Sequence, residues 1–363
     1  MATPLIRRLH IDKSLFVPLV LLSIISLLVL YSASGNNLDS SIAQFFRLVV
    51  GFGIMFTVAQ IRPETLYRWT PYIFGIGLTL LVIVLIMGVT GKGAQRWISL
   101  GIVNFQPSEI MKLGAPMMVA WFFSQRPLPP QLKQVAIAAA IILIPTALVA
   151  KQPDLGTALM IFSAGGFVLF LAGMGWRLIM TLVALAAASA PLVWTYYMHD
   201  YQRQRVLTLF DPGSDPLGTG YHTLQSMIAV GSGGVYGKGW LNGSQAHLNF
   251  LPESSTDFIF AVFAEEFGFL GILLIFTLYL FIVVRGIIIA TYAQDTFTRL
   301  LAGSLTLTFF FYFFVNIGMV TGVLPVVGVP LPLISYGGSS LVTLMAAFGM
   351  LMSIHTHRRI TQS

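Results

Sequence analysis

The sequence predicts an all-α polytopic membrane protein with about ten transmembrane helices. Three observations lead to this fold class: 56% of the 363 residues are hydrophobic, only 9% are charged, and the mean hydropathy is +0.84. A soluble domain carries about 25% charged residues, so this chain cannot cover a water-exposed surface of its size. A soluble enzyme, a disordered chain and a secreted disulfide scaffold are therefore excluded, the last also because the sequence has no cysteine.

A membrane-spanning helix needs about 20 mostly apolar residues. The first candidate follows Arg7, Arg8 and Lys13 as a signal peptide would, but its apolar run is long for one and Ser32-Ala33-Ser34 is a poor cleavage site. We therefore expect a retained helix and a single integral membrane domain over residues 1–363. The ten expected spans are 14–31, 41–60, 70–89, 107–124, 133–149, 155–173, 177–195, 258–284, 299–321 and 338–355.

The basic residues predict the orientation, because Lys and Arg gather at the cytoplasmic ends of spans. If the N-terminus is cytoplasmic and the ten spans alternate, 12 of the 20 basic residues fall on the cytoplasmic side. The outer loops 32–40 and 322–337 then hold no Lys or Arg. The sequence thus predicts a multi-pass protein with both termini in the cytoplasm. The net charge of +7 comes without a basic run, so we expect no nucleic-acid partner.

Eight basic residues do not fit this topological rule and fall on the outer side or within the membrane. Ten of the 13 acidic residues accompany them. Ionisable groups within a membrane are costly and indicate a functional site. We therefore expect the polar chemistry on the outer side of the protein. The eight are Arg47, Lys92, Arg96, Lys112, Lys151, Arg203, Arg205 and Lys238.

Two connections between spans are unusual. The segment 196–257 is a long outer loop, rich in Gly, Asp and Ser but with apolar amphipathic stretches, and we expect an ordered lid or platform. Between the last two spans, three prolines in the run 324–333 prevent a continuous helix. Irregular backbone at membrane depth is tolerated only where it is buried or lines a cavity. This second segment is therefore predicted to be a re-entrant loop beside a polar cavity, with Ser339 or Ser340 capping the tenth helix.

The fourth and sixth spans begin with charged residues. Glu109 and Lys112 are three residues apart, so they share a helix face and can pair. They are either a structural ion pair or, with Arg96 just upstream, a polar floor for a substrate. Asp154 occupies a natural N-cap position before an apolar run, which would explain this aspartate but not the neighbouring Lys151.

Two further segments carry candidate residues. Asp257, at the start of the eighth span, is either a helix cap or a general base whose pKa is raised by desolvation. The glycine-rich run 231–239 fails the spacing of both nucleotide-binding motifs. It is either a flexible turn or an anion contact through Lys238. The six histidines show no metal-ligand spacing, so we predict no zinc site.

The ordered set of motifs over most of residues 90–360 resembles the SEDS family (shape, elongation, division and sporulation). The short N-terminal tail and the closing residues 353–359 resemble its elongation branch more than its division branch. The matching strings are 93–97, 106–109, 151–157, 231–240, 250–260, 316–319 and 330–340.

This resemblance implies a peptidoglycan glycosyltransferase that polymerises lipid II at the outer face of the bacterial cytoplasmic (inner) membrane. It implies a class B penicillin-binding protein, of the penicillin-binding protein 2 type, and other elongation-complex proteins as partners. The family's catalytic aspartate corresponds to Asp257, and Glu109 and Lys112 match positions of functional importance. Asn104 departs from relatives that carry a basic residue there, so no cation is expected at that position.

The chemistry needs cations for the pyrophosphate leaving group. The candidates are Arg96, Lys112, Arg203, Arg205 and Lys238, or a divalent ion, for which the family suggests Mg²⁺ or Mn²⁺. Further candidate substrate-binding residues are Glu109, Lys151, Asp154 and Ser339. We expect no nucleotide or redox cofactor. Two alternatives stay open: a lipid II flippase, and a non-enzymatic scaffold for the penicillin-binding protein.

Overall fold

The computed structural model describes residues 10–91, 94–99, 104–198, 200–211, 219–244 and 253–357. Every predicted span is helical. Within the described residues, eight helices are long and apolar enough to cross a membrane, whereas α5 is not among them and α7 is a shorter apolar helix. The polytopic α-helical class is therefore confirmed, and the count of ten stays a prediction. The helices are α2 (Lys13–Ala33), α3 (Leu38–Ala59), α4 (Pro63–Met87), α5 (Pro107–Ser124), α6 (Leu132–Lys151), α7 (Leu155–Leu171), α8 (Trp176–Leu192), α12 (Ile259–Thr291), α13 (Thr296–Val320) and α14 (Ser339–Thr356).

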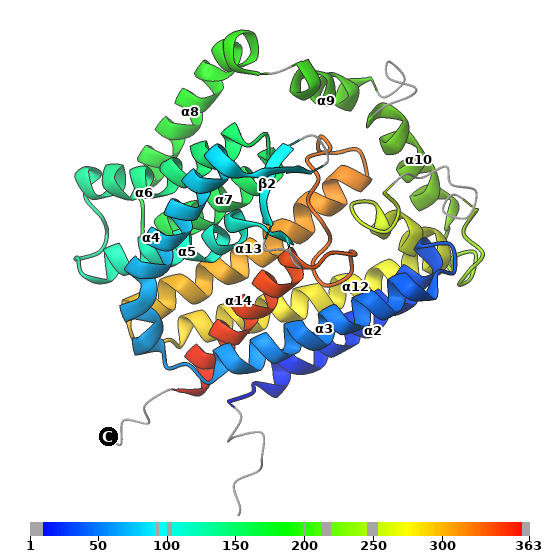
Figure 1. Cartoon of the computed structure of the whole chain (residues 1–363), viewed down its shortest axis with the longest axis horizontal. Coiled ribbons are helices and arrows are strands. Elements are labelled where there is room, and N and C mark those ends of the chain that lie inside the picture. Colours follow the sequence, from blue (N-terminus) through cyan, green and yellow to red (C-terminus); the bar gives the residue numbers. More distant parts are fainter. Residues whose placement is uncertain are drawn as a thin grey trace, which may run out of the picture.

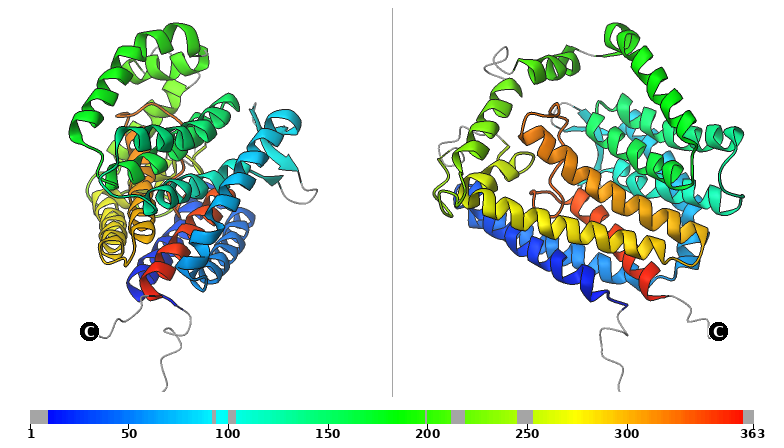
Figure 2. Two further views of the ribbon diagram at one scale, coloured as in Figure 1. Left: turned by 90° about the vertical axis from the view of Figure 1, so that its left-hand side faces the viewer. Right: turned by 180° about the vertical axis from the view of Figure 1, so that it is seen from behind.

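The helices pack around α13, whose apolar length is mostly buried, whereas α8 has no buried residue. Figure 1 shows α3, α12, α13 and α14 crossing the body, and α8 lying apart from it. After α8 the chain makes a π-helical turn, η1 (Val193–Tyr197), and continues as α9 (Asp200–Phe210) and α10 (Thr219–Ser232). The two views in Figure 2 show these elements as an arch that returns to the body at α10. The predicted long connection thus contains helices, although 199, 212–218 and 245–252 lie outside the described residues.

A small antiparallel sheet lies between α4 and α5. Its strands are β1 (Val89–Gly91), β2 (Ala94–Ser99) and β3 (Asn104–Phe105), in the order β1-β2-β3. Span-length hydropathy did not predict this sheet, because its strands are only 2–6 residues long. The sheet bears on the predicted site because β2 carries Arg96 and β3 leads directly into α5, which begins with the segment of Glu109 and Lys112.

The proline-rich loop between α13 and α14 is irregular and buried, as the sequence predicted. Its apolar residues Val329, Leu331, Leu333 and Ile334 are all almost inaccessible. Side chains from distant helices bind its carbonyl groups: the Ser26 hydroxyl donates to Ile334 O at 2.9 Å, and the Tyr279 hydroxyl donates to Pro332 O. The loop's polar backbone is therefore satisfied inside the protein, as irregular backbone in a membrane requires.

Helix α12 is kinked at Gly268, where φ is +62°. The turn after α10 replaces the hydrogen bonds that the kink breaks. Lys238 N and Gly239 N donate to Glu265 O and Glu266 O, each at 3.0 Å. In return, Phe269 N and Leu270 N donate to carbonyl groups of the same turn at 2.9 and 3.1 Å. The turn in the glycine-rich run 231–239 therefore hydrogen-bonds to α12 on both sides of the kink, and the alternative of a flexible turn stays a prediction.

Replacing Gly237 with alanine should disrupt the hydrogen bonds between this turn and the kink of α12. A Cβ at this position would lie 2.1 Å from Glu266 O, and the φ of +77° is unfavourable for any L side chain. We expect a loss of more than about 2 kcal/mol of unfolding free energy, measured by thermal unfolding in detergent. Gly231→Ala is the matched control, because its Cβ would meet nothing within 4 Å. Equal stability of the two variants would contradict a stabilising role for the hydrogen bonds between the turn and α12.

The start of α2 and the end of α14 meet at one end of the molecule. The His10 and His357 rings stack with centroids 3.9 Å apart, and Arg285 Nε binds Asp12 Oδ2 at 2.7 Å. Burial and the neighbouring His357 lower the pKa of His10 below its usual range. These contacts hold the start of α2 beside α12 and the end of α14.

Candidate active site

A cavity of about 690 Å³ lies where α7, α9, α10, α12 and the proline-rich loop meet. It brings together four residues that the sequence singled out: Arg96, Asp154, Arg205 and Asp257. These residues come from four separate parts of the chain, so the cavity joins one predicted carboxylate base with two guanidinium groups. The lining also includes three residues that the sequence did not single out as site residues: His222, Glu253 and Tyr336.

Asp257 lies in the turn immediately before α12. The N-cap of α12 is Phe258, and no side chain caps this end of the helix, so the capping explanation for Asp257 is wrong. The carboxylate faces the proline-rich loop: a Cβ added to Gly328 would lie 3.5 Å from Asp257 Oδ2. Asp257 is half-buried in the cavity wall. Asp257 therefore borders the cavity and does not cap the helix.

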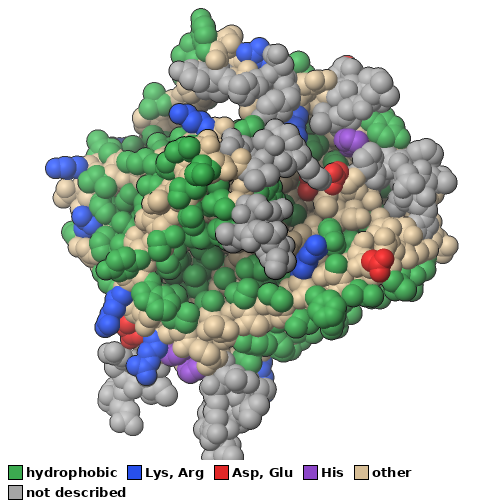
Figure 3. Space-filling view, in the orientation of Figure 1, with side chains coloured by type: hydrophobic (Ala, Val, Ile, Leu, Met, Phe, Trp, Pro, Cys, Tyr) green, Lys and Arg blue, Asp and Glu red, His purple; other side chains and the backbone are tan. Residues whose placement is uncertain are grey.

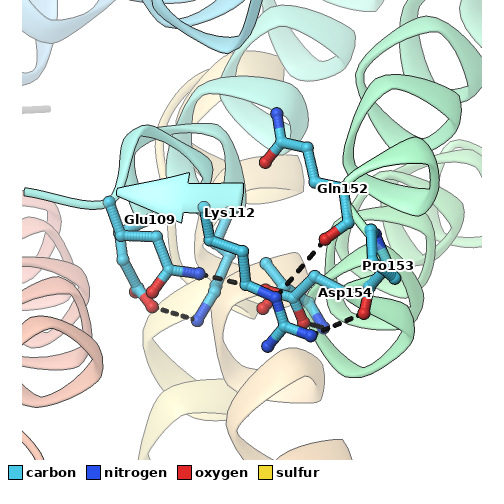
Figure 4. Close-up of polar contacts among 8 residues, drawn as sticks. Glu109, Lys112, Gln152, Pro153 and Asp154 are labelled. Carbon is cyan, nitrogen blue, oxygen red and sulfur yellow. Dashed lines mark hydrogen bonds and ion pairs between the residues drawn. The ribbon is translucent and has the colours of Figure 1, made fainter. Parts of the chain in front are cut away.

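Arg96 and Asp154 are held by the turn that precedes α7. Asp154 caps α7 by accepting from Thr157 N at 3.2 Å, as predicted, and its other oxygen accepts from Gln106 Nε2 at 3.0 Å. The Arg96 guanidinium donates to Pro153 O and lies 3.8 Å from Asp154 Oδ2. Figure 4 shows this turn beside the Glu109–Lys112 pair. The Asp154 carboxylate that caps α7 therefore also orients the Arg96 guanidinium at the cavity.

Glu109 and Lys112 form a buried ion pair at the start of α5, with Lys112 Nζ 2.7 Å from Glu109 Oε1. The ammonium also lies 5.5 Å from the ring centroid of Tyr312 on α13. Glu109 Oε2 is buried without a hydrogen-bond partner among the described residues. Glu109 lines an apolar groove described below, whereas Lys112 lines a small cavity beside the proline-rich loop. The pair therefore lies between the apolar groove and this small cavity.

Removing one partner of this pair should destabilise the protein, because a buried charge then loses its counterion. We expect Glu109→Gln or Lys112→Met to lower the unfolding free energy by about 3–5 kcal/mol. The double variant should recover most of this loss in thermal unfolding but should not recover activity. Recovery of both stability and activity would show that the pair is only structural.

The remaining predicted residues lie outside this cavity. Arg203 donates to Trp194 O at 2.9 Å and Thr195 O at 3.0 Å, so it binds η1. Lys238 binds the fully buried Glu265 at 2.6 Å rather than lining the cavity. Lys151 is the exposed last residue of α6. Ser339 begins α14 and lines the neighbouring groove, where the helix has no side-chain cap, so the predicted serine cap is wrong.

An apolar groove of about 830 Å³ runs between α3, α4, α5 and α14. Arg47 lines it, and the Arg47 guanidinium carbon lies 4.1 Å from the ring centroid of Tyr336, which lines the cavity. The groove and the cavity are therefore neighbours that share this cation–π contact. Figure 3 shows that hydrophobic side chains cover much of the surface around this region. The sequence had marked Arg47 only as a basic residue that broke the topological rule.

The fold and the cavity together define a polytopic membrane protein with a polar site beside an apolar groove. The family model FTSW_RODA_SPOVE, described as cell cycle protein, matches residues 12–360. The chain therefore belongs to the FtsW/RodA/SpoVE family, and the SEDS resemblance is confirmed.

The named relatives include MrdB, RodA and FtsW proteins. The chain is 54% identical to "Peptidoglycan glycosyltransferase MrdB" of Escherichia coli (strain K12), over 97% of this chain and 95% of the relative. It is 32% identical to "Peptidoglycan glycosyltransferase RodA" of Treponema pallidum, over 96% of this chain and 98% of the relative. Similarity to MrdB and RodA proteins thus extends over nearly the full length.

Solved structures show the same fold. A chain from "Structural coordination of polymerization and crosslinking by a peptidoglycan synthase complex" superposes with a TM-score of 0.83 at 31% identity, covering 95% of this chain and 97% of that chain. The Rod shape determining protein RodA of Thermus thermophilus superposes with a TM-score of 0.72 at 28% identity, covering 95% and 96%. An aspartate-to-alanine mutant of that RodA matches equally well.

Proposed function

We propose that this protein is a peptidoglycan glycosyltransferase that polymerises lipid II during cell elongation. The observation that carries the proposal is the cavity, which places Asp257 with Arg96 and Arg205 beside an apolar groove. A lipid-linked sugar diphosphate needs these three features: a base, cations for the diphosphate and an apolar surface for the lipid chain. The names of the MrdB and RodA relatives support the same activity.

In the proposed reaction, Asp257 acts as the general base. The 4-hydroxyl oxygen of an acceptor sugar forms a bond to the anomeric carbon of the growing chain, and its proton passes to the Asp257 carboxylate. The bond from the anomeric carbon to the undecaprenyl pyrophosphate oxygen breaks, and the pyrophosphate leaves with the electron pair. Arg96 and Arg205 line the same cavity and would stabilise the charge that develops there.

The groove would hold the polyprenyl chain. Its lining is mainly aliphatic and aromatic, and Arg47 lies at the side that meets Tyr336 and the cavity. A chain in the groove would therefore present its diphosphate towards Arg47 and its sugar towards Asp257. This arrangement keeps the lipid in an apolar environment while the reacting sugar stays in the polar cavity.

The proposed location is the bacterial inner membrane, with both termini in the cytoplasm and the cavity facing the periplasm. The distribution of basic residues and the shared position of the two helix ends support this orientation. The proposed partner is a class B penicillin-binding protein of the penicillin-binding protein 2 type, together with other elongation-complex proteins. The similar chain from a complex that couples polymerization and crosslinking supports this partner.

A requirement for Mg²⁺ or Mn²⁺ stays a prediction. The described part of the chain holds no group of three or more His, Cys, Asp or Glu residues that could bind a metal ion. Mg²⁺ is commonly held by substrate phosphates with one or two carboxylates, so the pyrophosphate would supply most ligands. We expect EDTA to lower polymerisation by more than about tenfold, with recovery when Mg²⁺ or Mn²⁺ is added. Full activity in EDTA would exclude a divalent ion.

Two assays of the purified protein distinguish polymerisation from translocation. Purified protein, with its penicillin-binding protein partner, is supplied with labelled lipid II in detergent, and glycan chains are resolved by gel electrophoresis. We expect chains longer than the starting disaccharide. Absence of polymer together with lipid II translocation in liposomes would support the flippase alternative, and absence of both would support the scaffold alternative.

A further inference from the structure

The backbone that carries Asp257 is fixed by donors from outside its own segment. Three consecutive carbonyl groups each accept one hydrogen bond. Ser255 O accepts from Tyr336 N at 2.9 Å, and Thr256 O accepts from the Ser335 hydroxyl at 2.6 Å. Asp257 O accepts from Asn316 Nδ2 at 2.9 Å. The first two donors belong to the proline-rich loop, and the third is a side chain of α13.

Asn316 links the segment that carries Asp257 to the proline-rich loop. Its side-chain amide donates its second hydrogen to Val329 O, in the proline-rich loop, at 2.8 Å. The residue is 0% exposed, and Oδ1 has no hydrogen-bond partner among the described residues. Both partners of Nδ2 are carbonyl oxygens, so only the NH₂ side of the amide can face them. A single planar group therefore fixes the distance between the Asp257 backbone and the loop.

This link joins the backbone of Asp257 to the loop that lies beside its carboxylate. Val329 follows Gly328, the residue that borders Asp257 Oδ2 on the cavity side. No side chain caps the start of α12. Local turn bonds join Thr256 N and Phe258 N to Glu253 O at 3.0 and 3.4 Å, whereas the Asp257 carbonyl is bound by Asn316. Asn316 thus holds both the residue that carries the base and the loop that borders it.

We propose that Asn316 is a positioning residue that holds Asp257 in the geometry required for proton transfer. The inference rests on the proposed function, in which Asp257 is the base. A base must lie within hydrogen-bond reach of the proton that it removes, and a displacement of about 1 Å can cost about 100-fold in rate. Loss of Asn316 should therefore lower kcat, whereas KM, set by the lipid and diphosphate contacts, should change little.

The test compares two substitutions of Asn316 with a control on the same helix. Asn316→Leu keeps the approximate volume and removes both donors. Asn316→Asp keeps the shape but places an oxygen against two carbonyl oxygens. The control is Ser304→Ala on α13: this hydroxyl is also 0% exposed and donates to Ala164 O at 2.7 Å, away from Asp257. Each protein is assayed for kcat, KM and thermal unfolding with lipid II and its partner.

We expect both Asn316 variants to lower kcat by about 10- to 100-fold, with KM within about threefold of the original. Ser304→Ala should lower the unfolding temperature without a comparable change in kcat. Ser335→Ala removes the neighbouring restraint on Thr256 O, so its effect on kcat should be non-additive with that of Asn316→Leu.

Four results would separate the possible failures. An unchanged kcat in Asn316→Asp, with Asp257→Asn inactive, would overturn this inference alone. An active Asp257→Asn would overturn the catalytic assignment on which it rests. A fall in kcat no larger than in Ser304→Ala would assign Asn316 to stability. The same conclusion would follow if both Asn316 variants failed to fold while Ser304→Ala folded.

Discussion

Replacement of Asp257 by asparagine is expected to abolish glycan polymerisation, with a fall in kcat of about 10²- to 10⁴-fold. The amide has nearly the same shape as the carboxylate but cannot accept the proton of the acceptor hydroxyl. Lipid II binding and thermal unfolding should change little, because Asp257 does not cap α12. The measurement is steady-state polymerisation by the purified protein with its partner.

Glu253→Gln is the matched control for this prediction. Glu253 lines the same cavity, and its carboxylate accepts from the Thr256 hydroxyl at 2.8 Å. The substitution removes the same charge from the same space, yet we expect less than about a tenfold fall in kcat. A larger effect at Glu253 than at Asp257 would transfer the role of base to Glu253.

Neutralising the two cavity arginines should produce the second large effect. Arg96 and Arg205 come from β2 and α9 and converge on the cavity that holds Asp257. Losing one donor that stabilises transition-state charge costs about 10²- to 10³-fold in rate. We therefore expect about this loss for Arg205→Gln and a greater loss for the double variant with Arg96→Gln. Arg205→Lys keeps the charge and should retain more activity.

Arg203 supplies the matched control, because it lies two residues from Arg205 on the same helix but binds the carbonyl groups of η1. Arg203→Gln should lower kcat by less than about tenfold. Similar losses at Arg203 and Arg205 would indicate a general effect of charge in α9 rather than a contact with the leaving group.

The sequence predicted the helices well, because hydropathy over about 20 residues reports burial in lipid directly. The start of α5 at Pro107 and of α7 after Asp154 were also predictable, since Pro and Asp favour the first positions of a helix. The kink at Gly268 was not predictable from the sequence. The turn whose backbone groups replace the hydrogen bonds lost at the kink lies about 30 residues earlier in the chain.

The site was predicted only in part, because local sequence signals report some of its residues but not contacts between distant parts of the chain. Local patterns identified Asp154, Asp257 and the cavity arginines, since charges in apolar surroundings stand out in a sequence. They could not distinguish Arg205 from Arg203, whose separation into cavity and η1 contacts depends on the fold of α9. Asn316 was visible only as part of a family motif, because its role depends on two carbonyl groups distant in the sequence.

The most direct test of the central claim is polymerisation in proteoliposomes that contain the protein, its partner and lipid II. Wild type and Asp257→Asn are compared at equal protein incorporation, and glycan chains are resolved on each side of the membrane. The proposed function predicts polymer from the wild type only, and only on the face opposite the two termini. Polymer from Asp257→Asn at the wild-type rate, or polymer on the face that carries the termini, would contradict it.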